Sequence, residues 1–600
     1  MKVSLLAGLV AAFPGALAVW PIPQTLQEGS ANTLVNWVSI STQGNAGRVV
    51  NNAVDRYRKI INRERFLAPA DYRRGMLLTS GSFGGLEGSA NTLVNWVSIS
   101  TQGNAGRVVN NAVDRYRKII NRERFLAPAD YRRGMLLTSG SFGGLVVSVA
   151  STDEALGLST DESYTLDVPV DGAATLHAKT PYGVVRGLET FSQLVTANGP
   201  VKAIANTPIH ISDAPAFAHR GVLFDSARNF YSLAAIFRTL DAMSYNKLNV
   251  FHWHIVDSQS WAVESATFPE LHLKGAYGPQ MTYSRADVKR VIRYAKDRGI
   301  RVVPEFDVPG HTYAVGQSHP ELMSCMNKQP NWDNYAAEPP SGQLNIALPA
   351  TVDFVNKLID EYAGLFTDEA FHIGGDEVNL KCWKDDPIVQ NYTAKTGMDV
   401  ETLLIKWYSQ VHDHLDATGK TPLTWEETVF DAHYVPSSKT IIQAWRSHDS
   451  VVSAVGKGYR VVASTYDSYY LDCGHGAWLS NMDGNSWCDP FKTWMHIYNY
   501  DILANITDAE QRKRVVGAEV AAWSEQTDET VIDPRLWPRA AAMAETAWSG
   551  KTDSAGHVRT TAEVASRLHA QRFRMVGRGI NAEPMQPLWC ARNPGACNLP

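Results

Sequence analysis

The sequence lacks a surplus of basic charge and, beyond its first residues, any long apolar run. Its 56 Lys and Arg residues are outnumbered by 61 Asp and Glu residues, which argues against a nucleic-acid partner. No later stretch reaches the ~20 apolar residues that cross a bilayer, so we expect no membrane partner. Tryptophan is plentiful instead, with 17 residues, and 600 residues suffice for two or more domains.

The first 18 residues have the pattern of an export signal. Lys2 precedes an apolar run, and Ala16 and Ala18 place small residues at the two key positions of a cleavage site. We therefore expect residues 1–18 to be a signal peptide and the mature chain to begin near Val19. The predicted location is secreted or extracellular, with the vacuole as the other compartment.

Cysteine is scarce, with six residues in 600, and all of them lie in the second half of the chain. An even number in an exported chain favours disulfides, although six cysteines allow 15 pairings. Sequential pairs close the shortest loops, so we expect Cys325 with Cys382, Cys473 with Cys488, and Cys590 with Cys597. Asn391 and Asn505 begin Asn-x-Thr acceptors and are predicted to be glycosylated surface sites.

An exact duplication occupies the N-terminal part of the chain. Residues 28–86 recur letter for letter as residues 87–145. Two identical copies are too few for a stacked-repeat architecture, and only one copy can occupy a given place in a fold. Each copy has more basic than acidic residues, mostly in an amphipathic stretch that we predict to be a solvated helix rather than a polyanion site.

Two regions differ in their pattern of apolar residues. Residues 19–215 are predicted to form a smaller α/β domain, which contains the duplication and a candidate propeptide region; strand-like runs from residue 146 precede a helical pattern. In residues 216–600, short apolar strands alternate with helices and a helical segment follows. Eight strand candidates predict a closed (β/α)8 TIM barrel, at residues 221–225, 249–257, 301–307, 370–374, 422–426, 440–445, 460–465 and 516–523.

Two adjacent carboxylates, Asp376 and Glu377, follow the fourth barrel strand. Neighbouring side chains on a regular strand point to opposite faces, so both can serve one site only where the backbone leaves β geometry. Gly374 and Gly375 permit that departure. Since catalytic residues of such barrels lie at the carboxyl ends of the strands, this pair is the first candidate for catalysis.

The other strand ends carry the residue types that a sugar pocket requires. Carbohydrates present apolar faces and a rim of hydroxyl groups, which indole rings and Arg or carboxylate groups can bind. A single Trp or Arg of this kind is more often an ordinary core or surface residue. Three Trp at successive barrel positions are harder to explain in that way. Its members are Arg228, His252, His254, Asp257, Gln259, His311, Trp425, Trp445, Tyr470, Asp472, Trp523 and Glu525.

Six motifs follow one another along the barrel: "HRGVLFDSARNF", "KLNVFHWHIVDSQSW", "PEFDVPGH", "FHIGGDEV", "GAEVAAWSE" and "PRLWPRAAAMAETAWSG". With them, residues 146–600 resemble glycoside hydrolase family 20, the β-N-acetylhexosaminidases, in particular the fungal secreted members. The resemblance implies an exo-acting enzyme without cofactor or metal. Its substrates would be terminal β-linked N-acetylglucosamine or N-acetylgalactosamine on chitooligosaccharides and glycoconjugates. A homodimer is also implied.

The resemblance further assigns the catalytic roles. The nucleophile is the acetamido oxygen of the substrate itself, so the reaction retains the anomeric configuration through an oxazolinium ion. Glu377 would be the general acid and then the base, Asp376 would hold the acetamido N–H, and Tyr470 would donate to the acetamido oxygen.

The remaining site residues would bind the sugar or support the acid. In the resemblance, Trp425, Trp445 and Trp523 enclose the N-acetyl group, and Asp257 with His311 forms a relay to Glu377. Arg228, Asp472 and Glu525 would bind the sugar hydroxyls at the closed end of the pocket, which makes the enzyme exo-acting.

Two other interpretations stay open. His252 and His254, as His-x-His at a barrel strand end, could belong to a metal-dependent hydrolase if later strands supplied further ligands. A non-hydrolytic sugar-binding protein would be favoured by loss of Asp376 or Glu377, and both residues are present.

Overall fold

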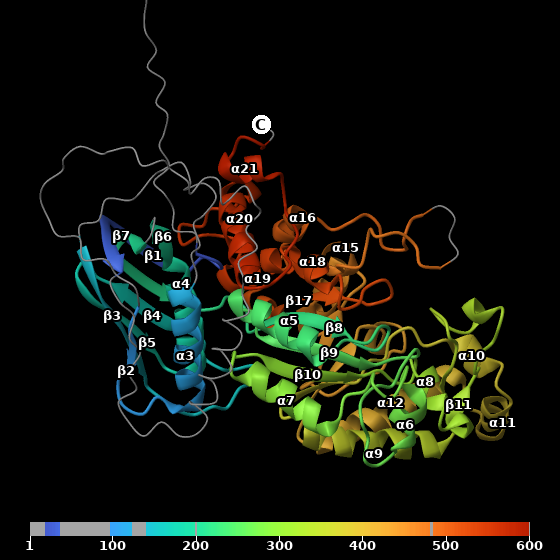
Figure 1. Ribbon diagram of the computed structural model, residues 1–600. Helices are drawn as coiled ribbons and strands as arrows, with labels where there is room; N and C mark the ends of the chain where they lie inside the picture. The colour runs from blue at the N-terminus through green and yellow to red at the C-terminus, as the bar shows by residue number, and fades with distance from the viewer. Residues whose placement is uncertain (1–18, 36–96, 123–139, 199–200, 480–483, 599–600) are drawn as a thin grey trace, which may run out of the picture.

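A computed structural model describes residues 19–35, 97–122, 140–198, 201–479 and 484–598. A small sheet with two helices precedes a large barrel, with the last helices of the chain beside both (Figure 1). The predicted signal peptide, residues 1–18, lies outside the described residues. Within them, no helix has the length and apolar character needed to cross a membrane.

The N-terminal sheet has the strand order β1-β3-β5-β4-β7-β6, with β2 paired to β3. Helices α3 and α4 lie together between this sheet and the barrel (Figure 1). The strand-like runs and the helix expected after residue 146 correspond to β3, β4, β5 and α4, so this smaller α/β domain is confirmed. The bounds are β1 Thr25–Val35, β2 Ile99–Thr101, α3 Gly106–Arg122, β3 Gly140–Val149, β4 Tyr164–Val168, β5 Gly172–Ala178, α4 Pro181–Leu194, β6 Val195–Asn198 and β7 Val201–Asp213.

The two identical copies contribute different elements. The first supplies residues 28–35 of β1, which pair with β7 and β3, whereas the second supplies β2, α3 and the start of β3. The expectation of a solvated helix was wrong for the second copy, because α3 buries an apolar face and, with it, Asp114 and Arg115. Arg115 donates to the backbone oxygen of Asp297 in the barrel domain (3.1 Å). The corresponding stretch of the first copy lies outside the described residues.

The barrel is closed, with eight parallel strands in the order β10-β13-β14-β15-β16-β17-β8-β9. Each predicted strand is present, and the predicted fold class is therefore confirmed. Residues such as Asp257 and Asp307, which we had included in strands, lie just beyond the strand ends. The bounds are β8 His219–Asp225, β9 Val250–Val256, β10 Arg301–Phe306, β13 Ala370–His372, β14 Thr421–Trp425, β15 Ile441–Ala444, β16 Arg460–Ala463 and β17 Val515–Ala522.

Helices surround the barrel and cover its strands with apolar faces. The longer ones are α5 Leu233–Tyr245, α7 Arg285–Lys296, α9 Pro349–Leu365, α11 Pro387–Thr396, α12 Val400–Ala417, α14 His448–Gly456, α19 Arg539–Ser549 and α20 Thr561–Gly577. Ser284 caps α7 in a capping box with Asp287. Shorter elements in the loops include β11 Met323–Ser324, β12 Gln343–Leu344, α13 Glu427–Phe430 and α15 Tyr466–Tyr469.

Buried ion pairs join the two domains. Glu162, in the small domain, accepts hydrogen bonds from Arg186 of α4 (2.7 and 2.9 Å) and from Arg220 of β8, and all three side chains are buried. Val19 and Trp20 are also fully buried, and the backbone of Trp20 is bonded to the side chain of Gln193. The first described residues therefore form part of the packed structure.

All six cysteines are paired in the predicted sequential order, as Cys325–Cys382, Cys473–Cys488 and Cys590–Cys597. Asn391 and Asn505 are both exposed, which the predicted glycosylation requires, and the modification itself stays a prediction.

Candidate active site

The turn after β13 brings Asp376 and Glu377 to the same site. Gly374 and Gly375 adopt φ values of 66° and 101°, and Glu377 itself has a φ of 51°, so the backbone leaves β geometry where the sequence predicted. The N–H of Gly375 donates to Oδ1 of Asp307 (2.9 Å), which ties the turn to the end of β10. A Cβ on Gly374 would overlap that same oxygen, and glycine is required here for space as well as for φ.

A chain of hydrogen-bonding groups leads to Glu377. Nε2 of His311 lies 3.2 Å from Oε2 of Glu377, and Nδ1 of His311 lies 3.1 Å from Oδ1 of Asp257. Burial lowers the pKa of His311, but the Asp257 carboxylate outweighs it and holds the pKa well above its ordinary value. Burial raises the pKa of Asp257, but the charges of Arg228 and His311 outweigh burial and hold that pKa well below its ordinary value. The predicted relay residues are thus connected to Glu377.

Asp376 is buried beside a second carboxyl group, Asp307. Burial and the charge of Asp307 raise the pKa of Asp376 well above its ordinary value, and burial also raises that of Asp307. Two carboxyl groups in one buried site cannot both ionise readily, so this pair retains a proton more strongly than isolated carboxyls would. His311 is within 3.9 Å of Asp376 and lies between the two predicted catalytic carboxylates.

Aromatic rings form one wall of the site. Trp425 from β14, Tyr470 and Trp523 pack together at ring-centroid distances of 6.1 Å, and Trp445 stacks on Tyr470 at 6.0 Å. The rings are fixed by polar contacts: Nε1 of Trp445 donates to Glu427 (2.8 Å). The Cys473–Cys488 disulfide packs against the same cluster. The three tryptophans and the tyrosine predicted from sequence therefore line a single apolar wall.

Arg228 lies among several carboxylates next to Trp523 of the aromatic wall. It lies 3.2 Å from Asp257 and 3.7 Å from Glu525, and its guanidinium is 4.6 Å from the centre of the Trp523 ring. Burial raises the pKa of Asp472 to about 7 and that of Glu525 well above normal.

Among the site residues predicted from sequence, three have a buried carboxylate oxygen without a hydrogen-bond partner in the described part of the chain: Oδ1 of Asp376, Oδ1 of Asp472 and Oε2 of Glu525. Buried acceptors are normally paired, so these oxygens are available to hydroxyl or N–H groups of a ligand. The predicted catalytic and sugar-binding residues lie near the carboxyl ends of the strands, whereas His252 lies within β9.

Sequence reasoning missed several residues of the site. Glu338 accepts from Nε of Arg228 (2.7 Å) and from Gln259 (3.1 Å), but it lies in an irregular loop between β11 and β12 that carries no strand signal. Glu427 has its pKa raised to about 8 by burial. Trp487 is exposed and packs edge-on against Trp445 and Tyr470.

The metal-site interpretation is not supported by the orientation of the histidines. His252 directs Nδ1 to Glu519 (2.7 Å) and Nε2 to Glu305 (3.1 Å). His254 directs Nδ1 to Glu305 (2.6 Å) and Nε2 to Asp257 (2.8 Å). Each ring nitrogen faces a carboxylate, and the charges of Glu519 and Glu305 overcome burial to raise the pKa of His252 to about 9. A metal requires neutral imidazole with a free lone pair.

Two adjacent carboxyl groups, close to an apolar wall and to unpaired acceptors, are suited to breaking a glycosidic bond. The fold and the site thus define a barrel glycoside hydrolase. Residues 217–551 match the family model "Glycosyl hydrolase family 20, catalytic domain", and residues 19–194 match the model "beta-acetyl hexosaminidase like". The chain belongs to glycosyl hydrolase family 20 and is a β-N-acetylhexosaminidase.

Individual relatives agree with this assignment. Beta-hexosaminidase 1 of Coccidioides posadasii is 37% identical over 486 residues, which cover 76% of this chain and 81% of that protein. A chitooligosaccharidolytic beta-N-acetylglucosaminidase of Ostrinia furnacalis is also 37% identical, over 77% of this chain and 79% of that protein. The structure of Flavobacterium johnsoniae chitobiase superimposes with a TM-score of 0.68 at 26% identity, covering 94% of this chain and 73% of that chain.

Proposed function

We propose that this enzyme removes single terminal β-linked N-acetylglucosamine or N-acetylgalactosamine units by a retaining, substrate-assisted mechanism. The observation that supports the proposal is that His311 lies close to both Glu377 (3.2 Å) and Asp376 (3.9 Å), so the two carboxylates can act on one substrate. Glu377 protonates the leaving oxygen and later, as base, activates water.

Asp376 and Tyr470 act on the acetamido group. The unpaired Oδ1 of Asp376 accepts the acetamido N–H and stabilises the positive charge of the oxazolinium ion. The hydroxyl of Tyr470 donates a hydrogen bond to the acetamido oxygen and orients that oxygen toward the anomeric carbon. The wall of Trp425, Trp445 and Trp523 excludes water that would compete with that oxygen.

The closed end of the pocket selects a chain terminus. Arg228, Asp472 and Glu525 bind the hydroxyls of a single non-reducing sugar, and the unpaired oxygens of the two carboxylates supply the acceptors. Chitooligosaccharides and glycoconjugates that end in an N-acetylhexosamine are the proposed substrates. Secretion, or delivery to the vacuole, is proposed from the N-terminal signal and the three disulfides, while the homodimer stays a prediction.

One pair of substrates tests the mechanism directly. The enzyme is expected to hydrolyse a nitrophenyl β-N-acetylglucosaminide, with and without a chelator, and to release the β-anomer first as followed by NMR. A nitrophenyl β-glucoside, which lacks the acetamido group, should be almost inert. Comparable hydrolysis of the plain glucoside, or release of the α-anomer first, would contradict the proposal.

A further inference from the structure

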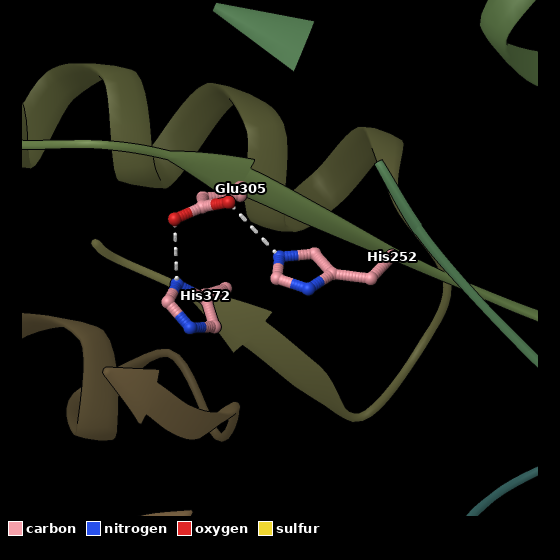
Figure 2. Close-up of side chains that lie close together, drawn as sticks. All are labelled: His252, Glu305 and His372. Carbon is pink, nitrogen blue, oxygen red and sulfur yellow. Dashed lines mark ion pairs between the residues drawn. The ribbon is translucent and has the colours of Figure 1, made fainter. Parts of the chain in front are cut away.

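Glu305 lies fully buried in the middle of the barrel, where its carboxylate faces the imidazole rings of three histidines and accepts the indole N–H of a pocket tryptophan. Figure 2 shows its carboxylate between the imidazole rings of His252 and His372, at 3.1 and 3.2 Å. Nδ1 of His254 lies 2.6 Å from the same oxygen that faces His252. Nε1 of Trp425 donates to the other oxygen at 2.7 Å. Residues of β9, β13 and β14 therefore meet on one carboxylate of β10.

Two of these partners lead to different parts of the active site. Trp425 belongs to the aromatic wall, and its ring lies next to those of His372 (5.0 Å) and Trp523 (6.1 Å). Nε2 of His254 lies 2.8 Å from Asp257. Asp257 in turn contacts His311, and His311 contacts Glu377. The carboxylate of Glu305 is thus the point at which the wall of the pocket and the support of the acid are joined.

Glu305 and His254 each stabilise the charged form of the other. Although burial raises the pKa of Glu305, the imidazoles of His254, His372 and His252 hold it well below normal. Burial lowers the pKa of His254, but Glu305, and then Asp257, hold it well above normal. The groups that face His254 are Glu305 from β10, Asp257 beyond β9, the nearby charge of Asp307 and the edge of the Trp523 ring.

We propose that Glu305 is a positioning residue for the hydrolysis: it fixes the Trp425 indole and orients the His254–Asp257–His311 relay behind Glu377 as one unit. The inference rests on the proposed roles of Glu377 and Trp425. Glu305 touches neither of the predicted catalytic carboxylates, so its effect passes through residues that do.

The substitution Glu305→Gln tests the proposal, because it keeps the size of the side chain and removes the charge. We expect kcat for chitobiose to fall about 10- to 100-fold, the range for a lost hydrogen bond to a charged group. KM should rise as the Trp425 wall loosens. Loss of the Glu305 charge should lower the pKa of His254, and kcat/KM should show a new decline where His254 loses its proton as pH rises.

Glu519→Gln is the matched control. Glu519 is equally buried in the barrel and accepts from His252 (2.7 Å), His219 (2.8 Å) and Gln443 (2.8 Å), but from neither Trp425 nor His254. It should lower the melting temperature as Glu305→Gln does, but because Glu519 bonds neither Trp425 nor His254, kcat and KM for chitobiose should stay near those of the parent. Equal kinetic losses and identical pH profiles in both variants would overturn the proposal, since they would reveal a purely structural role.

His254→Gln provides a second test if Glu305→Gln is not secreted in folded form. It breaks the connection to Asp257 and leaves the Trp425–Glu305 bond in place, so kcat for chitobiose should fall at least about tenfold while KM stays near that of the parent. An unchanged kcat would overturn the proposal. Failure of the parent to discriminate against the plain glucoside would instead defeat the proposed function, so the two failures are distinguishable.

Discussion

Glu377 and Asp376 are adjacent in sequence, yet their surroundings differ. Glu377 is about one-third exposed and touches His311, whereas Asp376 is buried against Asp307. The exposed group can meet the leaving oxygen of a substrate, and the buried one has an unpaired oxygen for an N–H group. The two side chains are therefore suited to different steps of one reaction, and substitutions should separate them.

Glu377→Gln should remove the proton donor and leave the shape of the site intact. Turnover of chitobiose should fall by roughly 10²–10⁴, with little change in melting temperature. A nitrophenyl leaving group needs less protonation, so the loss on a nitrophenyl glycoside should be smaller. Steady-state kinetics on both substrates measure the difference, and equal losses would speak against Glu377 as the acid.

Asp307→Asn should shift the acidic limb of the pH profile. The charge of Asp307 is one cause of the raised pKa of Asp376, and asparagine removes it while keeping an oxygen for the N–H of Gly375. The proposed mechanism requires ionised Asp376, so kcat/KM of the parent should fall as pH drops through this raised pKa. In the variant that decline should move to lower pH, and a limb that stays in place would contradict the role of the pair.

The turn after β13 is the element on which the site depends. It places Gly374, Gly375 and Glu377 in left-handed conformations within four residues and fits closely around Asp307. Such backbone is costly for residues other than glycine and persists where surrounding contacts hold it. The turn therefore links the position of Glu377 to the end of the neighbouring strand β10.

Gly374→Ala should abolish most activity and destabilise the protein, because a Cβ would overlap Asp307 and the φ of 66° disfavours alanine. Gly397→Ala is the control, since Gly397 has a φ of 69° at the end of α11 but nothing within 4 Å of its added Cβ. Each change costs about 1 kcal/mol for φ alone. Melting curves and kcat of both variants separate the cost of the positive φ from the overlap with Asp307. A Gly374→Ala variant with normal activity would contradict this account.

Elements were predictable from the sequence where local pattern decides them. The eight barrel strands are short apolar runs between helices, and the catalytic pair follows one of them directly. Glu338 was not predictable, because its place beside Arg228 depends on the folding of a long irregular loop. Nor could the sequence tell which of Glu426 and Glu427 accepts the indole N–H of Trp445, because that depends on the turn into α13. Glu427 accepts it, whereas Glu426 accepts the backbone N–H of Trp445 and pairs with Arg446.

At the scale of the whole molecule, buried charges hold the two domains together. Glu162 lies between Arg186 and Arg220, and although burial raises its pKa, the two guanidinium groups lower it below normal. Folding is thus favoured by the ionised carboxylate above the usual glutamate pKa of about 4.3. That contribution is lost as pH falls through the lower pKa of the folded state.

Glu162→Gln should destabilise the protein by about 3–5 kcal/mol, because two buried guanidinium groups lose their counter-charge. Asp167→Asn, in strand β4 just after Glu162, is the control: its pair with His210 is about half exposed and should contribute little. Chemical denaturation at neutral pH measures both. Similar small effects would show that the domains are held together by other contacts.

Deleting residues 87–145 tests the duplication. The remaining copy joins residue 86 to residue 146 in the same sequence as the present junction, so one copy can supply β1 as well as β2, α3 and β3. Secretion yield, melting temperature and chitobiose turnover should equal or exceed those of the parent. A fall of several degrees with lost secretion would show that both copies are needed.

The Cys473–Cys488 disulfide connects the residue after Asp472 to the residue after Trp487, within the wall of the pocket. Two side chains that face the substrate site are thus tethered by a covalent bond that only an oxidising compartment supplies. Protein made in a reducing bacterial cytoplasm should fold its barrel, but without this disulfide the pocket wall should be less ordered. A recombinant source for this enzyme should therefore be a host that exports it.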